Sequence, residues 1–179
     1  TEQLNQYMVS KQADTVMLLF LLDTLFDQEI KRKNFIFYED KTLHDSSLSK
    51  STHAILANDL GLEKMAYDLY EGALTIDLGT QMKSSNEGIH SASAGGIWES
   101  TVMGFGGVRM EGEHMRIAPK LPEKWNRLIF PLCFKGNSFI VKADHKSVVV
   151  ENNGKKDVAI LLGKEMVTIA AGQKVKRNL

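Results

Sequence analysis

The sequence has little of what marks several classes of protein. It contains a single cysteine, Cys133, which excludes an internal disulfide framework and a zinc cluster built on cysteines. One cysteine fits a reducing compartment, and we expect a cytoplasmic location. No apolar run approaches the length of a membrane span, because the longest, Val16–Leu22, is followed at once by Asp23. We therefore expect no contact with a membrane.

An excess of charge of either sign is also absent, since 22 Lys and Arg residues balance 22 Asp and Glu residues. A neutral chain has no general electrostatic attraction to nucleic acid, so we expect no such partner. The sequence lacks a nucleophile elbow, a phosphate-binding P-loop, a dinucleotide glycine fingerprint and metal-ligand spacing. We therefore predict neither a metal nor an organic cofactor.

What is present is the composition of a globular protein, with 43% hydrophobic and 25% charged residues in 179 positions. The first half predicts helices. Ser10 is a candidate cap for an apolar segment that reaches Phe26, and apolar side chains cover so much of its circumference that we predict a buried helix. Further helices are predicted at 49–60, 63–76 and 89–103. The last begins with the small residues 91–96, which suggests that another backbone or a ligand comes close.

From Gly106 onward the apolar residues alternate with period two, which is typical of strands. Residues 108–110 and 114–117 flank a Glu-Gly-Glu turn and predict a hairpin. Short strands are predicted at 128–134, 139–143, 147–151, 158–162 and 166–170. The sequence thus predicts an α+β fold with helices in residues 1–105 and an antiparallel sheet domain in residues 106–179, which we expect to be structural.

A hydroxyl-rich turn at residues 42–49 precedes the second predicted helix. Its serine hydroxyls and the free N–H groups of the helix start could hold a small oxyanion such as phosphate, and His44 could add a proton. The alternative is a serine-rich N-cap without a ligand. His90 stands at another hydroxyl-rich helix start, so the two histidines could converge on one anion. His53, inside the second predicted helix, is predicted to be packed or hydrogen-bonded.

Taken in order, six short segments resemble the C-terminal part of glycoside hydrolase family 65, over about residues 8–135. That family holds the inverting phosphorylases of maltose, kojibiose, nigerose, trehalose and trehalose 6-phosphate. The resemblance implies the later helices of an (α/α)6 barrel followed by a small antiparallel C-terminal β-sheet domain. The segments are Lys11-Gln12-Ala13-Asp14, Tyr38-Glu39, His44-Asp45-Ser46-Ser47-Leu48-Ser49, Glu87-Gly88-Ile89-His90 with Ala92-Ser93 and Gly95–Trp98, Gly104-Phe105-Gly106-Gly107, and Leu121-Pro122-Glu123-Lys124-Trp125.

The resemblance also implies roles for individual residues. Ser46, Ser47 and His90 match groups that bind phosphate, the co-substrate that attacks the glycosidic bond in place of water. His44 belongs to the same motif, where it either touches phosphate or braces the loop. Neutral hydroxyls, N–H groups and an imidazole suit this task, because a carboxylate base would repel the attacking anion.

The same resemblance assigns Lys11 and Gln12 to the glucosyl unit of the disaccharide. The general acid of the family is a glutamate upstream of the matched segment, and neither Glu39 nor Glu87 lies in the corresponding motif. We therefore predict no catalytic residue in this chain and no phosphorolytic activity for the chain alone.

Three functions remain open at this stage: a portion of a phosphorylase, a portion of a hydrolase of the same fold such as a trehalase-like enzyme, or a non-catalytic chain. The sequence begins with Thr1 and enters a helical pattern almost immediately, so we expect a fragment or processed product. Helices that line a closed barrel would expose apolar faces without their neighbours. We therefore expect a homo-oligomer, or association with the N-terminal remainder of the same enzyme.

Overall fold

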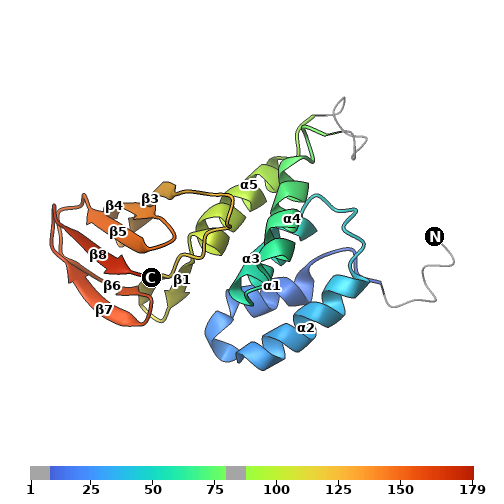
Figure 1. Cartoon of the computed structure of the whole chain (residues 1–179), viewed down its shortest axis with the longest axis horizontal. Coiled ribbons are helices and arrows are strands. Elements are labelled where there is room, and N and C mark those ends of the chain that lie inside the picture. Colours follow the sequence, from blue (N-terminus) through green and yellow to red (C-terminus); the bar gives the residue numbers. More distant parts are fainter. Residues whose placement is uncertain (1–8, 80–87) are drawn as a thin grey trace. The chain divides into compact units, whose positions relative to one another are not determined.

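The chain divides into two units, residues 1–101 and 102–179. The structure is a computed structural model and describes residues 9–79 and 88–179. The first unit is helical and the second consists of two small sheets, which confirms the predicted α+β class (Figure 1). Among the helices of the described residues, none is both long enough and apolar enough to cross a membrane.

Five α-helices form the first unit within the described residues. The helices predicted at 49–60 and 63–76 are confirmed with small differences at their ends. The predicted segment 89–103 is split between an α-helix and a following π-helical stretch, and the division between the two units falls within that stretch. The helical elements are α1 (Asp14–Leu21), a 3₁₀ turn (Asp23–Leu25), α2 (Gln28–Lys41), α3 (Ser49–Asp59), α4 (Glu63–Leu74), α5 (Ser91–Glu99) and the π-helical η3 (Ser100–Phe105).

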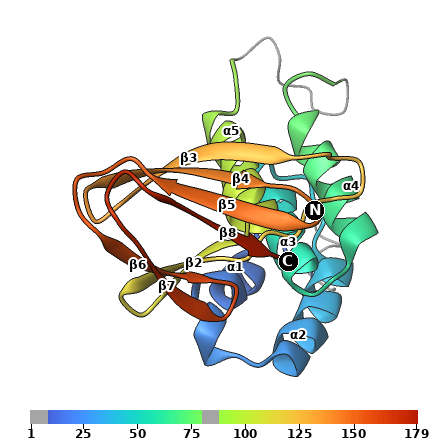
Figure 2. The same ribbon diagram turned by 60° about the vertical axis from the view of Figure 1, so that its left-hand side comes forward.

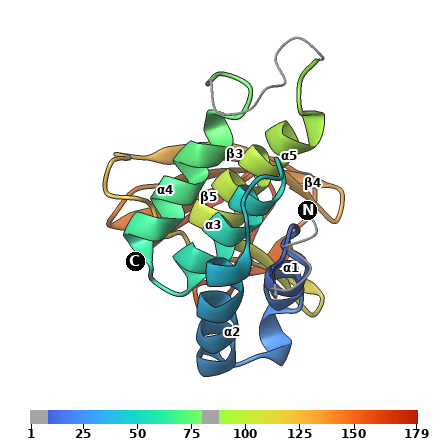
Figure 3. The same cartoon turned by 90° about the vertical axis from the view of Figure 1, so that its right-hand side faces the viewer.

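Helix α3 is the centre of the first unit, because α1, α2, α4 and α5 all contact it (Figure 3). Every residue of α3 is buried except Lys50 and Asp59. Small residues such as Ser51, Ala54 and Ala57 let the neighbouring helices approach it closely. The first residues of α3, and the turn before them, are therefore held from several sides.

The expectation for the first helix is partly wrong. Ser10 does not cap it: this residue forms an isolated bridge with Thr42, and the N-cap position is Ala13, which makes no capping hydrogen bond with its side chain. The helix stops at Leu21, and large apolar residues of this region, including Leu21 and Leu25, are exposed. Burial of the whole apolar segment would require further chain to pack against it.

The prediction missed helix α2 entirely. Its start carries a recognisable signal, since the Asp27 carboxylate accepts a hydrogen bond from the Ile30 N–H at 2.8 Å. The helix buries little, mainly Phe35 and the stem of Lys31, whose ammonium pairs with Asp23. A helix with so narrow an apolar face gives almost no periodic signal.

The second unit contains two four-stranded sheets (Figure 2). Buried side chains from both sheets form one core. One sheet has the order β1-β2-β6-β7 and the other β3-β4-β5-β8. Buried residues such as Ile117 and Ile160 from the first sheet and Phe139 and Val141 from the second meet in this core. The strands are β1 (Val108–Glu111), β2 (His114–Ile117), β3 (Leu128–Phe134), β4 (Asn137–Ala143), β5 (Ser147–Asn152), β6 (Val158–Leu162), β7 (Glu165–Ile169) and β8 (Lys174–Asn178).

The predicted hairpin and the five predicted strands are confirmed, but two features of this unit differ from expectation. Strand β2 pairs with β6 in parallel, through Arg116–Leu161 and Ile117–Leu162, so the sheet is not wholly antiparallel. Strand β8 was not predicted, because its residues are mostly exposed and charged, and among the described strands its backbone pairs with β5 alone. Pairing at a sheet edge depends on the neighbouring strand, which local sequence does not reveal.

Candidate functional site

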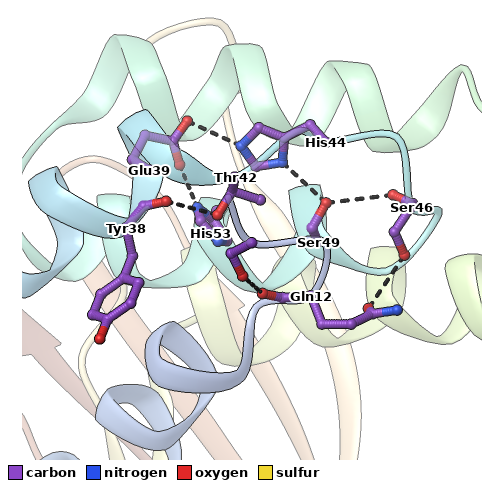
Figure 4. A network of polar contacts seen from close by, with 9 residues as sticks. Gln12, Tyr38, Glu39, Thr42, His44, Ser46, Ser49 and His53 are labelled. Atoms are coloured by element: carbon purple, nitrogen blue, oxygen red, sulfur yellow. Dashed lines mark hydrogen bonds and ion pairs between the residues drawn. The ribbon is translucent and has the colours of Figure 1, made fainter. Parts of the chain in front are cut away.

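A polar network joins the end of α2, the turn at 42–48 and the start of α3 (Figure 4). At its centre, Glu39 from the last turn of α2 lies between two imidazoles. One carboxylate oxygen, Oε1, is 3.2 Å from Nε2 of His44, which lies in the turn. The other, Oε2, is hydrogen-bonded to Nδ1 of His53 on α3. Each oxygen of the carboxylate thus has its own histidine partner.

Burial and hydrogen bonding act on Glu39 in opposite directions. Desolvation by burial raises its pKa, but hydrogen bonds and Coulombic attraction from His44 and His53 together outweigh this and lower the pKa to about 2. His53 is fully buried, at 0% exposure, and its ring also packs against Phe35. Glu39 is therefore ionised at neutral pH and cannot act as a general acid. The predicted packed, hydrogen-bonded state of His53 is confirmed.

His44 occupies an unusual backbone conformation that its side chain stabilises. Its φ angle is 50°, in the left-handed region, which costs a residue with a side chain about 1–3 kcal/mol. The ring is held at both nitrogens, Nε2 by Glu39 and Nδ1 by the Ser49 hydroxyl at 3.0 Å. These two hydrogen bonds offset the backbone strain and fix the direction in which the turn leaves α2.

The network continues from Ser49 through the turn to the segment before α1. The Ser49 hydroxyl lies 3.4 Å from the Ser46 carbonyl oxygen, which can accept its proton. The Ser46 hydroxyl accepts from the Leu48 N–H and donates to Oε1 of Gln12, both at 3.3 Å. The Ser10–Thr42 bridge keeps that segment beside the turn. The structure therefore brings together Gln12, Ser46 and His44, three residues singled out from the sequence.

Two of the other predicted residues lie in these same segments. Ser47 is half-buried in the turn, and Lys11 is exposed beside Gln12. The capping alternative is wrong in its simple form, because the N-cap residue of α3 is Leu48 and no side chain in the described residues caps this helix. The Ser46 hydroxyl is engaged with Gln12 and with the N–H of Leu48, and the Ser49 hydroxyl with His44 and the Ser46 carbonyl oxygen.

His90 forms a separate pair at the start of α5. Its Nδ1 lies 2.6 Å from one oxygen of Asp77, and its backbone N–H donates to the other oxygen at 3.0 Å. The side-chain hydrogen bond from His90 is the main cause that lowers the pKa of Asp77. Over residues 9–79 and 88–179, no hydrogen bond or ion pair links this pair to His44, and the convergence of the two histidines on one anion stays a prediction. Glu87, quoted in the same motif, lies outside the described residues.

The small residues at the start of α5 allow it to pack closely on α3. A Cβ atom added at Gly96 would collide with the Ser51 hydroxyl of α3, whereas one at Gly95 would meet nothing within 4 Å among the described atoms. The close neighbour of Gly96 is therefore a side chain of α3 and not the backbone that was expected, and the alternative of a ligand stays a prediction. Ser93, one turn before Gly96, is also buried, and its hydroxyl has no partner in the described part of the chain.

Glu39, His44 and His53 are also the residues whose chemistry comes nearest to a metal site. One ligand atom from each lies within 4.8 Å of the others, and two imidazoles with a carboxylate suit a transition metal. Both imidazoles, however, contact the carboxylate directly. A cation would have to break both hydrogen bonds, so we interpret the cluster as carboxylate–imidazole pairs.

The comparisons with known proteins agree with this arrangement of motifs. The model of the glycosyl hydrolase family 65 central catalytic domain matches residues 1–99, and the model of the C-terminal domain of the same family matches residues 108–169. The chain belongs to glycosyl hydrolase family 65. The resemblance stated from the sequence is confirmed.

Several members of family 65 are close in sequence to this chain. A kojibiose phosphorylase of Halothermothrix orenii is 46% identical over 166 residues, which are 90% of this chain and 21% of the relative. A maltose phosphorylase of Bacillus subtilis is 41% identical over 141 residues, which are 79% of this chain and 19% of the relative. Among solved structures, a putative kojibiose phosphorylase from the human microbiome superposes with a TM-score of 0.88 at 32% identity, covering 96% of this chain and 24% of that one. The chain thus spans about a fifth of the length of these curated relatives.

Proposed function

We propose that this chain is the C-terminal part of an inverting disaccharide phosphorylase, which cleaves an α-linked glucose disaccharide with phosphate to give β-glucose 1-phosphate and glucose or a glucose derivative. Residues 1–105 would contribute the later helices of an (α/α)6 catalytic barrel, and residues 106–179 the C-terminal sheet domain. Ser46, Ser47 and His90 would bind phosphate together with the turn that contains His44. Lys11 and Gln12 would bind the glucosyl unit. Phosphate is a co-substrate in this scheme, and no cofactor is invoked.

The observation that carries the proposal is the state of the carboxylates beside these residues. An inverting hydrolase needs a free carboxylate that activates water. Glu39 and Asp77, the carboxylates that contact the two histidines, are both tied to imidazoles. The serine hydroxyls and backbone N–H groups of the turn are the groups that can stabilise an attacking anion, and the one carboxylate of the turn, Asp45, is exposed. This arrangement favours phosphorolysis over hydrolysis.

Gln12 supports the same reading, because its hydrogen bond with Ser46 joins the predicted sugar segment to the predicted phosphate turn. In an inverting phosphorolysis the phosphate attacks the anomeric carbon of the bound glucosyl unit, so the two subsites must be neighbours. The general acid would come from outside this chain, since Glu39, with its pKa near 2, cannot supply a proton. We accordingly propose that the chain alone is inactive.

The proposal is tested by restoring the part that carries the acid. The C-terminal fifth of the Halothermothrix orenii kojibiose phosphorylase is replaced by this chain, and the chimera is assayed on kojibiose, maltose, nigerose and trehalose. We expect β-glucose 1-phosphate to form only with phosphate present, and the isolated chain to give none. Release of glucose at equal rates with and without phosphate would show a hydrolase instead. Turnover by the isolated chain would contradict the absence of an acid.

A structural observation also bears on partners. Leu21 and Leu25, in and just after α1, are 62% and 70% exposed, and Leu18 is exposed beside them. Apolar side chains gathered in this way are typical of a surface that another chain covers. We propose that the first unit associates with the N-terminal remainder of the enzyme or, without it, with a second copy of itself. A cytoplasmic location is part of the same proposal.

A further inference from the structure

We propose that Glu39, with His53 behind it, is a positioning residue for the phosphate-binding turn, and that His44 transmits its effect without touching phosphate. This inference rests on the proposed function. It assigns the two histidines of the predicted phosphate site to different tasks, a distinction that the motif alone leaves open. The geometry at the ring nitrogens of His44 and His90 carries it.

Both ring nitrogens of His44 are already engaged. Nε2 faces the Glu39 carboxylate at 3.2 Å, and Nδ1 faces the Ser49 hydroxyl at 3.0 Å. Because an ionised carboxylate only accepts hydrogen bonds, Nε2 must carry the proton. An imidazole held in this way has no ring nitrogen left for an anion. His44 is therefore placed to brace the turn.

His90 differs in this respect. Asp77 takes only Nδ1 of its ring, and Nε2 makes no hydrogen bond to any residue the structure describes. A carboxylate on Nδ1 fixes the orientation of the ring and leaves Nε2 available, the arrangement by which carboxylates orient functional imidazoles. His90 is thus the histidine placed to contact phosphate.

The brace acts on the turn through Ser49. With the ring proton of His44 on Nε2, the Ser49 hydroxyl donates its one hydrogen to Nδ1 and also lies 3.4 Å from the Ser46 carbonyl oxygen, while the Ser46 hydroxyl contacts Gln12 (Figure 4). His44 is also the turn residue with a left-handed backbone, so the conformation that presents Ser46 and Ser47 depends on what holds its ring. The His44 ring is fixed by Glu39, whose carboxylate is hydrogen-bonded to Nε2 of that ring.

His53 is the hydrogen-bond partner of the second carboxylate oxygen of Glu39. Its Nδ1 is hydrogen-bonded to Oε2, and its ring lies edge-on to that of His44, with centroids 4.8 Å apart. Its Nε2 is buried without a partner in the described residues, which suits a bare acceptor better than an N–H. His53 is therefore the Nδ1–H tautomer, and Glu39 cannot rotate away from His44 without breaking this second bond.

Substitution of Glu39 by glutamine has a specific consequence. The two imidazoles face different oxygens of Glu39, and a glutamine side chain in the same place turns its acceptor oxygen to one of them and its donor nitrogen to the other. In Glu39→Gln, either His44 or His53 must therefore exchange tautomer, or one hydrogen bond is lost. A side chain that merely fills space would produce no such change.

The experiment follows the ¹⁵N-labelled 179-residue chain by NMR during a titration with inorganic phosphate. The variants are Glu39→Gln, Ser49→Ala and, as a control of equal charge change, Glu63→Gln, an exposed residue in the first turn of α4. The spectra report the tautomer of each histidine ring, the backbone amides of Ser46 and Ser47, and the phosphate Kd. Ser49→Ala removes the hydrogen bond between His44 and the Ser49 hydroxyl, but it leaves the contacts of Glu39 with His44 and His53 in place. If Glu39→Gln does not fold, Ser49→Ala still tests the proposal.

In the unsubstituted chain we expect phosphate to shift the His90 ring and the Ser46 and Ser47 amides, while His44 keeps its Nε2–H tautomer. Glu39→Gln should change a tautomer and weaken phosphate binding about tenfold, as removal of an outer partner of a binding group commonly does. Ser49→Ala should weaken binding similarly without a change of tautomer. Glu63→Gln should match the unsubstituted chain.

Two results would overturn the brace: a phosphate Kd in both Glu39→Gln and Ser49→Ala equal to that of Glu63→Gln, or a phosphate response larger at the His44 ring than at the His90 ring. If the unsubstituted chain binds no phosphate, the proposed phosphate site is wrong. The positioning role of Glu39 is then tested by the NMR resonances of the Ser46 and Ser47 backbone amides. These resonances must shift in Glu39→Gln and must stay unchanged in Glu63→Gln.

Discussion

The stability of the chain should depend on Glu39 in a way that varies with pH. In Glu39→Gln the carboxylate between His44 and His53 is replaced by a group with one acceptor. At pH 7 we expect the variant to lose about 1–3 kcal/mol of unfolding free energy, because a buried imidazole loses a hydrogen bond to a charged partner. This loss should shrink as the solution is acidified.

The pH dependence follows from the pKa of Glu39, which is lowered from 4.5 to about 2 in the folded chain. A carboxyl group with a depressed folded pKa stabilises the fold above its unfolded pKa, and this contribution disappears as the pH falls toward the folded pKa. The full difference corresponds to about 3 kcal/mol, since one pKa unit is worth about 1.4 kcal/mol. About 1 kcal/mol of it should be lost by pH 4 and about 2 kcal/mol by pH 3.

Urea unfolding of the chain and of Glu39→Gln, at steps from pH 7 down to pH 3, measures this effect. The unfolding free energy of the chain should fall more steeply below pH 5 than that of the variant, so the two curves approach each other. Glu63→Gln, at an exposed position, provides the matched control and should run parallel to the unsubstituted chain. A gap between the chain and Glu39→Gln that stays constant down to pH 3 would refute the reasoning, because it would mean that Glu39 titrates at its ordinary pKa.

Two further predictions concern packing and association. Gly96→Ala should destabilise the chain by about 1–3 kcal/mol in thermal unfolding, because the new Cβ would lie 3.0 Å from the Cβ of Ser51 and closer still to its hydroxyl. Gly95→Ala, whose Cβ meets nothing within 4 Å among the described atoms, should stabilise the helix by up to about 1 kcal/mol. If Gly95→Ala proved less stable than Gly96→Ala, α5 would not pack on α3 as described. Replacing Leu21 and Leu25 together by serine should lower self-association in sedimentation velocity with little change in unfolding free energy, since both side chains are exposed; a monomeric parent chain would contradict this.

Elements with strong local signals could be predicted from the sequence. The hairpin of β1 and β2 follows from alternating apolar residues around a glycine turn, and α3 and α4 follow from apolar periodicity and the stop at Gly61. Helix α2 and strand β8 escaped prediction because both are stabilised mainly by what they lie against. The few buried residues of α2 and the exposed residues of β8 carry no periodic pattern.

The candidate site divides in the same way. The sequence indicated the hydroxyl-rich turn and the residues within it, since serine and histidine at a helix start suggest anion binding without knowledge of the fold. It did not indicate that Glu39 would engage both His44 and His53, or that Asp77 would hold His90. These contacts join residues on different elements, and one of the elements was not predicted.

The sequence by itself determined the family, the α+β class and which residue types stand in the turn, because motifs in order and local periodicity are properties of the chain alone. Only the tertiary structure decided what each of these side chains does. It joined Gln12 to Ser46, and it left one histidine with no ring nitrogen for a ligand and the other with one. The reason is physical: a hydrogen bond depends on distances of a few tenths of an ångström between groups that the packing of α1, α2 and α3 brings together.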